Sequence, residues 1–293
     1  NLHAEFRSWY LAMAAYNAGE GRIRKAIKRG GSRDFWTLVE RQVLPRETMN
    51  YVPQFLAAMI IGRNLDLSGY FDVLDPGSYI ETPGKCGGAD SVVYSDWSVI
   101  RTEGLIRGIV SATPTGVKVQ LYLYDVAKQA LVLGKEYEGD RSQIRMIAHR
   151  FSNEVMKFFT GLIGPFGSEI AFSSRVGRFK ELFVMEMDGS NVHQLTNEHA
   201  LALSPSWNAT GDELVYTSYR NRMPDLFTID SSSKKTRQIT RGEALEVSPH
   251  FNLSGNSIIA SRSLERSSDI VSFNLDGTLS RQLTKSDGSI NVS

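Results

Sequence analysis

A repeat of 44 residues occupies the last part of this chain and constrains its fold more than any other feature. The tripeptide Gln-Leu/Ile-Thr occurs at 194–196, 238–240 and 282–284, a constant step of 44 residues. Chance rarely holds several landmarks in one register, and a second motif, Ser-Pro-x-aromatic, keeps the same step at 204–207 and 248–251. Residues 164–293 are therefore built from repeated units.

Each unit is predicted to contain several short β-strands. Runs of β-branched and aromatic residues at 214–218 and 225–229 are separated by turn residues. A period of about 40–45 residues with about four short strands is typical of a β-propeller blade, and closed propellers contain about 4–8 blades. Only about three units are present, and residues 289–293 stop where a fourth would open. We therefore predict a partial β-propeller of about three four-stranded blades in an incomplete ring.

The repeat also carries a family resemblance. LFVMEMDGSNVHQLT at 182–196 and LSPSWNATGDELVYTS at 203–218 resemble the repeat of TolB, the periplasmic propeller protein of the Tol-Pal envelope system. The alternative is a propeller of another family, such as the one attached to prolyl-oligopeptidase-type hydrolases. No Gly-x-Ser-x-Gly nucleophile motif occurs in the chain, which disfavours that alternative.

The region before the repeat, residues 65–163, is predicted to be a small α/β domain. The stretch LSGYFDVLDPGSYIE at 67–81 resembles the early part of the TolB amino-terminal domain, here without that family's first strand. A sheet that is covered by a helix forms a two-layer domain. The hydrophobic patterns predict strands at 106–112, 117–124 and 131–137 and a helix at 142–160.

Polar residues near these helices suggest where the helices begin. Asp140 is the expected N-cap of the helix at 142–160, and Ser95 or Asp96 is the expected cap of a shorter helix upstream. His149 lies beside the apolar stripe and is expected to be a packed helix residue rather than a ligand.

Residues 1–64 have the periodicity of α-helices. Gly19 is suited to a left-handed cap after the first helix, and Pro53 is placed near the start of the last one. Two aromatic stripes at helical spacing predict the amphipathic faces: Phe6, Trp9, Tyr10, Met13 and Tyr16 in the first helix, and Tyr51, Phe55 and Ala58 in the last.

The helical segment resembles a second family. LAMAAYNAGEGRIRKAI, followed by DFWTLVERQVLPRETMNYVPQFLAAMIIGRN, resembles the back half of the lytic transglycosylase domain of the SLT/MltD-like type. The resemblance implies a lysozyme-like helical fragment, from a family that cleaves peptidoglycan and leaves 1,6-anhydro ends. It also implies that Tyr16, Asn17 and Tyr51 bind glycan, which suits a phenol with an apolar face and a polar rim. The alternative is that both tyrosines are half-buried core residues.

The catalytic acid of that family is not expected in this chain. Glycan cleavage needs a carboxylic acid that is kept protonated in an apolar cleft. The family's glutamate lies many tens of residues before the first tyrosine motif, whereas fifteen residues precede Tyr16 here. Glu5 is interpreted as an exposed helix residue and Glu20 as a favourable charge in a helix first turn. We therefore expect no catalytic residue.

Charge and composition narrow the partners. Residues 1–64 hold ten Lys/Arg and five Asp/Glu, a balance of +5, and the remainder holds 23 against 27, a balance of −4. The basic segment faces either an anionic polymer (nucleic acid, teichoic acid or peptidoglycan) or only solvent. Cys86 is the only cysteine and the five histidines form no close pair, so we predict no disulfide, metal or cofactor. No apolar run is long enough to span a membrane, and no signal peptide is recognisable.

These observations predict a multidomain chain with a helical fragment at 1–64, an α/β domain at 65–163 and propeller blades at 164–293. The leading function is a periplasmic interaction protein with a peptidoglycan-binding remnant, in a chimeric or truncated chain. The alternatives are an active lytic transglycosylase and a passive glycan-binding module. The expected partners are peptidoglycan, a Pal-like lipoprotein and a second copy that covers the open propeller edge. Nucleic acid is not expected, nor is TolA, because the TolB peptide that contacts TolA is not in this chain.

Overall fold

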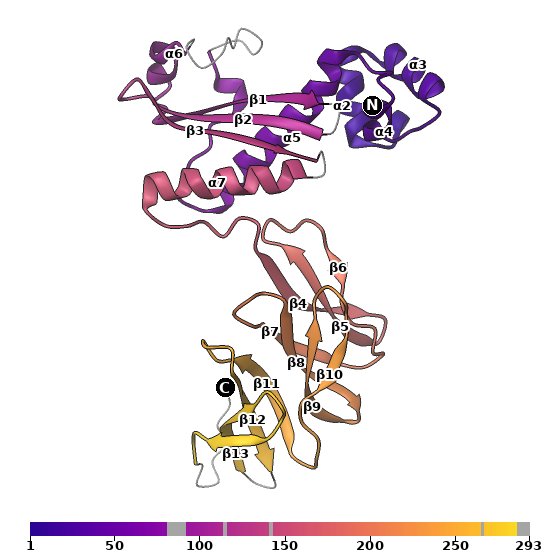
Figure 1. Cartoon of the computed structure of the whole chain (residues 1–293), viewed down its shortest axis with the longest axis vertical. Coiled ribbons are helices and arrows are strands. Elements are labelled where there is room, and N and C mark those ends of the chain that lie inside the picture. Colours follow the sequence, from indigo (N-terminus) through magenta and orange to yellow (C-terminus); the bar gives the residue numbers. More distant parts are fainter. Residues whose placement is uncertain (81–91, 114–115, 141–142, 265–266, 286–293) are drawn as a thin grey trace. The chain divides into compact units, whose positions relative to one another are not determined.

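The computed structural model describes residues 1–80, 92–113, 116–140, 143–264 and 267–285. The chain divides into two compact units, residues 1–167 and residues 168–293 (Figure 1). The first unit contains helices and an α/β layer, and the second contains the repeated sheets, which confirms the predicted fold class. Cys86, Ser142 and the segment 289–293 lie outside the described residues. The finer division at residue 64 stays a prediction.

Five helices open the first unit, and the predicted first helix is in fact two. Arg7 adopts a left-handed conformation with φ 50°, and the Ser8 side chain then caps a new helix by accepting from the Leu11 amide. A serine N-cap explains the break, because its oxygen satisfies an amide that the new first turn leaves free. The helices are α1 (Leu2–Phe6), α2 (Trp9–Ala18), α3 (Glu20–Gly30), α4 (Phe35–Glu40) and α5 (Arg46–Leu67).

Trp9 and Tyr16 of the first aromatic stripe face outward, whereas Phe6 of the same stripe is buried in the core. Trp9 is 68% exposed and Tyr16 is 77% exposed. The buried face of α2 is made of Leu11, Ala14 and Ala15, and the two small alanines allow neighbouring helices to approach closely. Large aromatic residues and small apolar residues both recur at helical spacing, so the pattern alone did not show which face of the helix is buried.

Helix α5 belongs to two hydrophobic cores. Val52, near its start, packs with α2, α3 and α4, whereas Ile61 and Leu65, near its end, pack with the sheet and with α7 (Ile144–Thr160). Asn64 is fully buried, and its Nδ2 lies 3.0 Å from both His149 Nδ1 and Ser152 Oγ on α7. Pro53 is the eighth residue of α5, beyond the first turn where a missing donor is tolerated, because the helix begins at Arg46.

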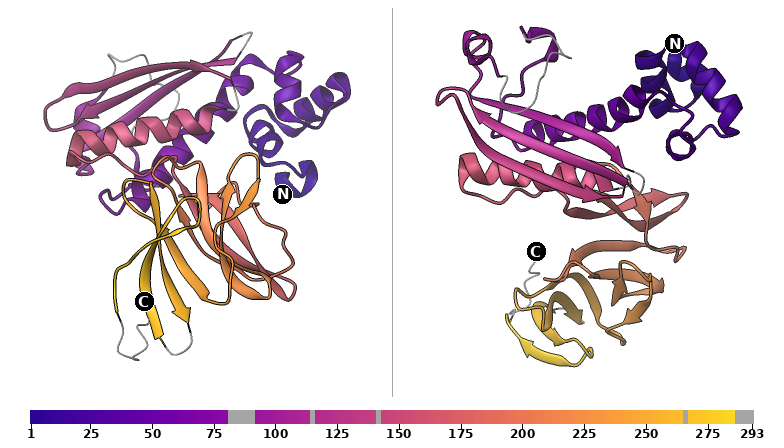
Figure 2. Two further views of the ribbon diagram at one scale, coloured as in Figure 1. Left: turned by 60° about the horizontal axis from the view of Figure 1, so that its bottom comes forward. Right: turned by 45° about the horizontal axis from the view of Figure 1, so that its top comes forward.

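A three-stranded antiparallel sheet completes the first unit (Figure 2). Alternate residues of its central strand, from Val117 to Leu123, pack with α5 and α7 on one face, and Trp97 of α6 (Tyr94–Val99) covers part of the other. The predicted caps are wrong. Gln143 is the N-cap residue of α7, and α6 begins after Val93 without a side-chain cap. The strands are β1 (Gly104–Thr113), β2 (Gly116–Asp125) and β3 (Ala130–Gly139).

The second unit contains three consecutive antiparallel sheets, which we call blades 1, 2 and 3. Blades 2 and 3 have four strands, as predicted, whereas blade 1 has three in the described residues. Blade 1 comprises β4 (Glu169–Val176), β5 (Phe179–Glu186) and β6 (His193–Gln194); blade 2 comprises β7 (Ala202–Trp207), β8 (Glu213–Asn221), β9 (Met223–Asp230) and β10 (Thr236–Gln238); blade 3 comprises β11 (Leu245–Phe251), β12 (Ser257–Leu264), β13 (Ser267–Asn274) and β14 (Leu279–Gln282).

Blade 2 lies between blades 1 and 3 and is buried on both of its faces. Successive side chains of a strand point to opposite faces, so they pack alternately on the two neighbours. Leu214, Tyr216 and Phe227 point to blade 1, where they pack on Leu182 and other residues of that sheet. The intervening side chains point to blade 3 and pack on Ile258, Ala260 and their neighbours; they include Val215 and Leu226. Two-sided burial explains the consecutive apolar residues Leu214-Val215-Tyr216 in β8 and Leu226-Phe227 in β9.

A carboxylate and a threonine recur at equivalent positions of every blade, and the threonine ties the end of each blade to the preceding strand. The threonine hydroxyl accepts a hydrogen bond from a backbone amide in each case, at 2.8 Å in blade 1, 3.0 Å in blade 2 and 2.9 Å in blade 3. The adjacent carboxylate accepts from the threonine in blades 1 and 3. This contact explains why Thr is kept in the tripeptide. The three pairs are Glu181–Thr196, Asp225–Thr240 and Asp269–Thr284.

Replacing the middle threonine tests this role. Thr240 is 4% exposed, so Thr240→Val leaves the buried Leu226 amide without its acceptor. We expect the local stability of blade 2 to fall by about 1–3 kcal/mol, measured by hydrogen exchange in β8 and β9. The matched control is Thr236→Val, which changes an exposed threonine four residues upstream, in β10, and is expected to alter stability by less than about 0.5 kcal/mol. Unchanged exchange in Thr240→Val would contradict the assignment.

Candidate functional site

Helices α2 and α5 bring the three predicted glycan-binding residues together. Asn17, at the end of α2, accepts a hydrogen bond from Thr48 Oγ1 at 2.8 Å, and its Nδ2 lies 3.5 Å from Glu47 Oε1. Thr48 is 1% exposed, so this contact anchors the loop end of α2 against the first turn of α5. Tyr16 and Tyr51 flank the anchor from the two helices.

The two tyrosines form part of an exposed aromatic surface. Tyr16 is 77% exposed, Tyr51 is half-buried, and the Tyr51 ring stacks on Phe55 with centroids 6.0 Å apart and planes at 26°. Burial raises the pKa of the Tyr51 phenol, and the charge of the neighbouring Tyr16 phenol adds to that shift. Tyr16 is therefore not a core residue, and its ring can contact a partner.

Three residues beside the tyrosines were not predicted as site residues, although Phe55 belongs to the predicted stripe of the last helix. Glu47 and Thr48 precede Tyr51 by four and three positions, so they lie on the same side of α5, and Phe55 follows it by four. That i, i+3, i+4 spacing from Tyr51 was the sequence signal that could have indicated these three residues. It carried no information about Asn17, because the contact joins residues about thirty positions apart.

The carboxylates nearest in sequence to the first tyrosine do not resemble a proton donor. Arg24 holds both of them: its Nε lies 2.6 Å from Glu5 Oε1, and its Nη2 lies 2.9 Å from Glu20 Oε2. The hydrogen bond from Arg24 lowers the pKa of Glu5, whereas a general acid needs a raised one. Glu47, which touches Asn17, is exposed to solvent. These three groups supply no sheltered acid beside the tyrosines.

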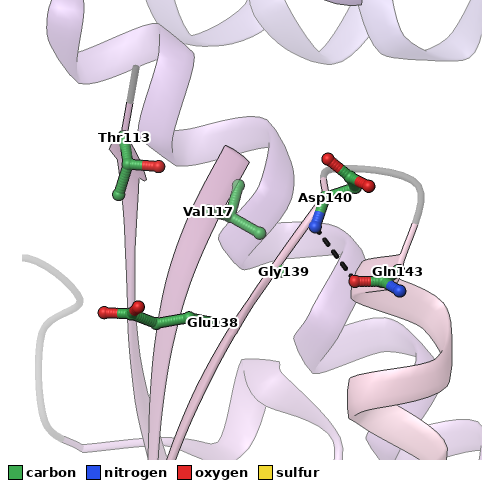
Figure 3. Close-up of a pocket in the computed structure, with 6 residues that line it drawn as sticks. All are labelled: Thr113, Val117, Glu138, Gly139, Asp140 and Gln143. Atoms are coloured by element: carbon green, nitrogen blue, oxygen red, sulfur yellow. Dashed lines mark hydrogen bonds between the residues drawn. The ribbon is translucent and has the colours of Figure 1, made fainter. Parts of the chain in front are cut away.

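A separate hollow of about 430 Å³ lies where β1, β2 and β3 meet the start of α7 (Figure 3). The carboxyl groups of Glu138 and Asp140 lie on either side of Val117, and Gln143 Oε1 accepts from the Asp140 amide at 3.0 Å. The polar groups do not converge on one point, and both carboxylates are exposed. The hollow therefore offers no catalytic pair.

Comparison with known proteins follows the same order along the chain. The transglycosylase SLT domain model matches residues 1–39, the TolB amino-terminal domain model matches residues 45–132, and the TolB beta propeller domain model matches residues 148–293. The chain is thus similar to an SLT domain at its start and to the two domains of TolB over the rest of the matched residues. The resemblances predicted from the two sets of motifs are thus confirmed, and the TolB-like match begins at α5.

The alignments with relatives of the TolB-like part cover only a portion of this chain and only a portion of each relative. It is 34% identical over 150 residues to the Tol-Pal system protein TolB of Syntrophotalea carbinolica, which is 51% of this chain and 35% of that protein. For the TolB of Methylobacillus flagellatus, the identity is 29% over 210 residues, or 69% and 47%. The chain thus spans about a third to a half of these relatives.

The crystal structure of TolB from Acinetobacter baumannii has the same fold. It superposes with a TM-score of 0.72 at 24% identity, over 80% of this chain and 58% of that one. Among the described residues, no helix has the length and apolar character needed to cross a bilayer.

A double-mutant cycle tests the anchor between the SLT segment and α5. Thr48→Val removes the donor to Asn17, and Asn17→Ala removes the acceptor. We expect each single change to lower the stability of α2 by about 0.5–1.5 kcal/mol, and the double change to lower it by less than their sum. Hydrogen exchange of the α2 amides measures all four proteins. Strictly additive effects would show that the two side chains are not coupled.

Proposed function

We propose that this chain is a periplasmic cell-envelope interaction protein of the Tol-Pal type, whose SLT segment binds peptidoglycan without cleaving it. Two TolB domain matches and relatives named for the Tol-Pal system support the first part. The aromatic surface of Tyr16, Tyr51 and Phe55 supports the second. We further propose that the chain is divided at 1–64, 65–163 and 164–293, as a chimera of two envelope proteins.

Glycan recognition follows from the chemistry of the surface. A pyranose ring has an apolar C–H face, which packs on an aromatic ring, and a rim of hydroxyl groups, which need hydrogen-bond partners. The exposed Tyr16 ring supplies the first, and the Asn17 amide and Glu47 carboxylate beside it supply the second. The peptide stems of peptidoglycan carry carboxylates. The basic side chains of α3, including Lys25, Lys28 and Arg29, are exposed and favour such a polymer.

Lytic transglycosylase activity is the second candidate, and the SLT match over residues 1–39 favours it. It requires a protonated carboxylic acid in an apolar cleft. In the described residues the carboxylic acid that contacts Asn17 is Glu47, and its side chain is exposed to solvent. Binding without turnover therefore fits the described residues better.

A sedimentation assay with purified peptidoglycan sacculi separates these functions. We expect the intact chain to co-sediment, and Tyr16→Ala combined with Tyr51→Ala to weaken the apparent affinity by about tenfold, or about 1.4 kcal/mol. Tyr70→Ala is the matched control, because Tyr70 is 58% exposed but lies outside the aromatic surface. The supernatants are analysed for 1,6-anhydro muropeptides, and we expect none. Equal binding by all variants would refute the glycan site, and anhydro products would favour the enzyme.

The TolB-like part is proposed to bind a Pal-like lipoprotein, because the relatives are named for that system. We expect the chain to be retained on an immobilised, soluble form of the peptidoglycan-associated lipoprotein from Syntrophotalea carbinolica. Retention should be unaffected by Tyr16→Ala, which changes only the SLT segment. No retention above an uncoated support would count against this partner.

A further inference from the structure

Each contact between neighbouring blades contains two buried carboxylates. We call the contact between blades 1 and 2 the first junction and the contact between blades 2 and 3 the second junction. Glu181 and Glu198 lie at the first junction, and Asp225 and Glu246 lie at the second. The Glu198 side chain is 6% exposed, and the other three residues are 1–4% exposed. A buried carboxylate is costly unless it is paired and hydrogen-bonded, so the partners of these four groups decide how each junction behaves.

The first junction supplies a donor to every carboxylate oxygen. Glu181 accepts from the backbone amides of Glu198 and His199, at 3.1 Å and 2.9 Å, one on each oxygen. Glu198 accepts from the Ser218 hydroxyl on one oxygen and pairs with Arg220 Nη1 at 3.0 Å on the other. Hydrogen bonds to a carboxylate stabilise its charged form, so these contacts favour the anion at both positions.

The second junction leaves one oxygen of each carboxylate without a hydrogen bond in the described residues. These oxygens are Asp225 Oδ1 and Glu246 Oε2, and both are buried. The other Asp225 oxygen accepts from Gln238 Nε2 at 3.0 Å. The other Glu246 oxygen lies 3.3 Å from Arg262 Nε, which forms an ion pair with it but not an aligned hydrogen bond. Two buried carboxylates and one guanidinium therefore lie here with fewer donors than at the first junction.

The 44-residue step identifies the substitutions that separate the two junctions. The position equivalent to Glu198 is Gly242, so the segment that enters blade 3 has no carboxylate at that place. The position equivalent to Ser218 is Arg262, which is paired with Glu246 across β11 and β12. The acid of the second junction therefore lies in a strand rather than in a connecting segment.

Electrostatics favour the neutral acid at Glu246. Burial raises the pKa of the Glu246 carboxyl, and the negative charge of Asp225 raises it further. The Arg262 charge and the Thr240 hydroxyl lower this pKa, but the net direction is upward. A neutral carboxyl leaves one charge fewer to bury, and its O–H is a donor that the second junction otherwise lacks.

The other elements packed against β11 add no further charge beside Glu246 in the described residues. Strand β7 contains no ionisable residue, and the tyrosines of β8 are phenols, which carry no charge in acidic solution. Strand β12 contributes Arg262 and no other charge. Apart from Asp225, the charged side chains of β8, β9 and β13 have partners of their own: Glu213 pairs with Arg237, Arg220 pairs with Glu198, and Asp230 and Asp269 accept from Ser232 and Gln282.

We propose that Glu246 binds a proton between blades 2 and 3, so that the second junction responds to pH whereas the first does not. The proton comes from solvent and converts the Glu246 carboxylate to the neutral acid, whose O–H becomes a donor inside the junction. When the pH rises, Glu246 releases this proton, and two carboxylates must then be accommodated beside one guanidinium. The contact between blades 2 and 3 is therefore most stable in acid and weakens toward neutral pH.

An NMR titration of the full chain, isotope-labelled at its glutamate carboxyl carbons, tests the proposal. We expect a carboxyl that titrates above 4.5, the ordinary glutamate value, and whose signal is missing in Glu246→Gln. Asp225→Asn should move the midpoint of this titration down, because it removes a neighbouring negative charge. Glu243→Gln is the matched control, because Glu243 is an exposed glutamate in the segment that leads into β11, and its loss should leave the shifted signal in place.

Hydrogen exchange as a function of pH measures the consequence for stability. Because the folded pKa of Glu246 is raised, the stability that its neutral form contributes is fully present below pH 4.5 and is lost as the pH rises through the folded pKa. We expect the opening of β11 and β12, corrected for intrinsic exchange, to increase by up to about tenfold per pH unit in that interval. Glu246→Gln should remove this dependence, and the amides of β4 and β5 should not show it in any variant.

Both measurements are repeated with EDTA, which distinguishes a proton from a metal ion at the same oxygens. A transition that disappears in EDTA, or a midpoint at or below 4.5 for every glutamate, overturns the proposal. So does a shifted signal that persists in Glu246→Gln, a midpoint that Asp225→Asn leaves unchanged, or an exchange profile with the same pH dependence in blades 1 and 3. If Glu246→Gln does not fold, the wild type and Asp225→Asn still decide the question. None of these results depends on binding of peptidoglycan or of a lipoprotein.

Discussion

Each blade of a propeller has two apolar faces, and each face needs an adjacent sheet to exclude water. Blade 2 meets this requirement completely, because its alternate side chains pack on blade 1 through Tyr216 and Phe227 and on blade 3 through Val215 and Leu226. The hydrogen bonds that the repeated threonines accept from backbone amides form within single blades. Burial of the blade faces needs an adjacent blade, so packing between blades couples each unit to its neighbours.

The repeat made most of the second unit predictable from sequence. Strand periodicity is two, so a fixed 44-residue step assigns every side chain in β8 and β9 to a face once one of them is known. Blade 1 has three strands in the described residues, and the first landmark of the repeat, at 170–172, already lies in β4. The sequence therefore contained no pattern for a strand of blade 1 before β4. Helix periodicity was less informative. It located the aromatic stripe with Trp9 and Tyr16 but not its direction, since the small face of Leu11 and Ala14 has the same spacing. The predicted cap Asp140 failed because the described helix begins after Gln143.

The candidate site was predictable only in part, and only through resemblance. The motifs located Tyr16, Asn17 and Tyr51, yet nothing local in the sequence joins α2 to the first turn of α5. The structure supplies that link through Thr48, a buried hydroxyl that holds the Asn17 amide. It also places an exposed carboxylate, Glu47, beside the Asn17 amide. Contacts between residues distant in sequence remain invisible to periodicity, and they decide which surface residues act together.

Helix α5 gives the first unit a mechanical property that a flexible linker would not. Its 22 residues extend about 33 Å at about 1.5 Å per residue, and opposite ends of this single rod are embedded in different cores. The buried Asn64 fastens one end to α7, while Thr48 fastens the other end to α2. A force applied to a ligand bound at Tyr16 would therefore be transmitted along this one helix to the α/β layer.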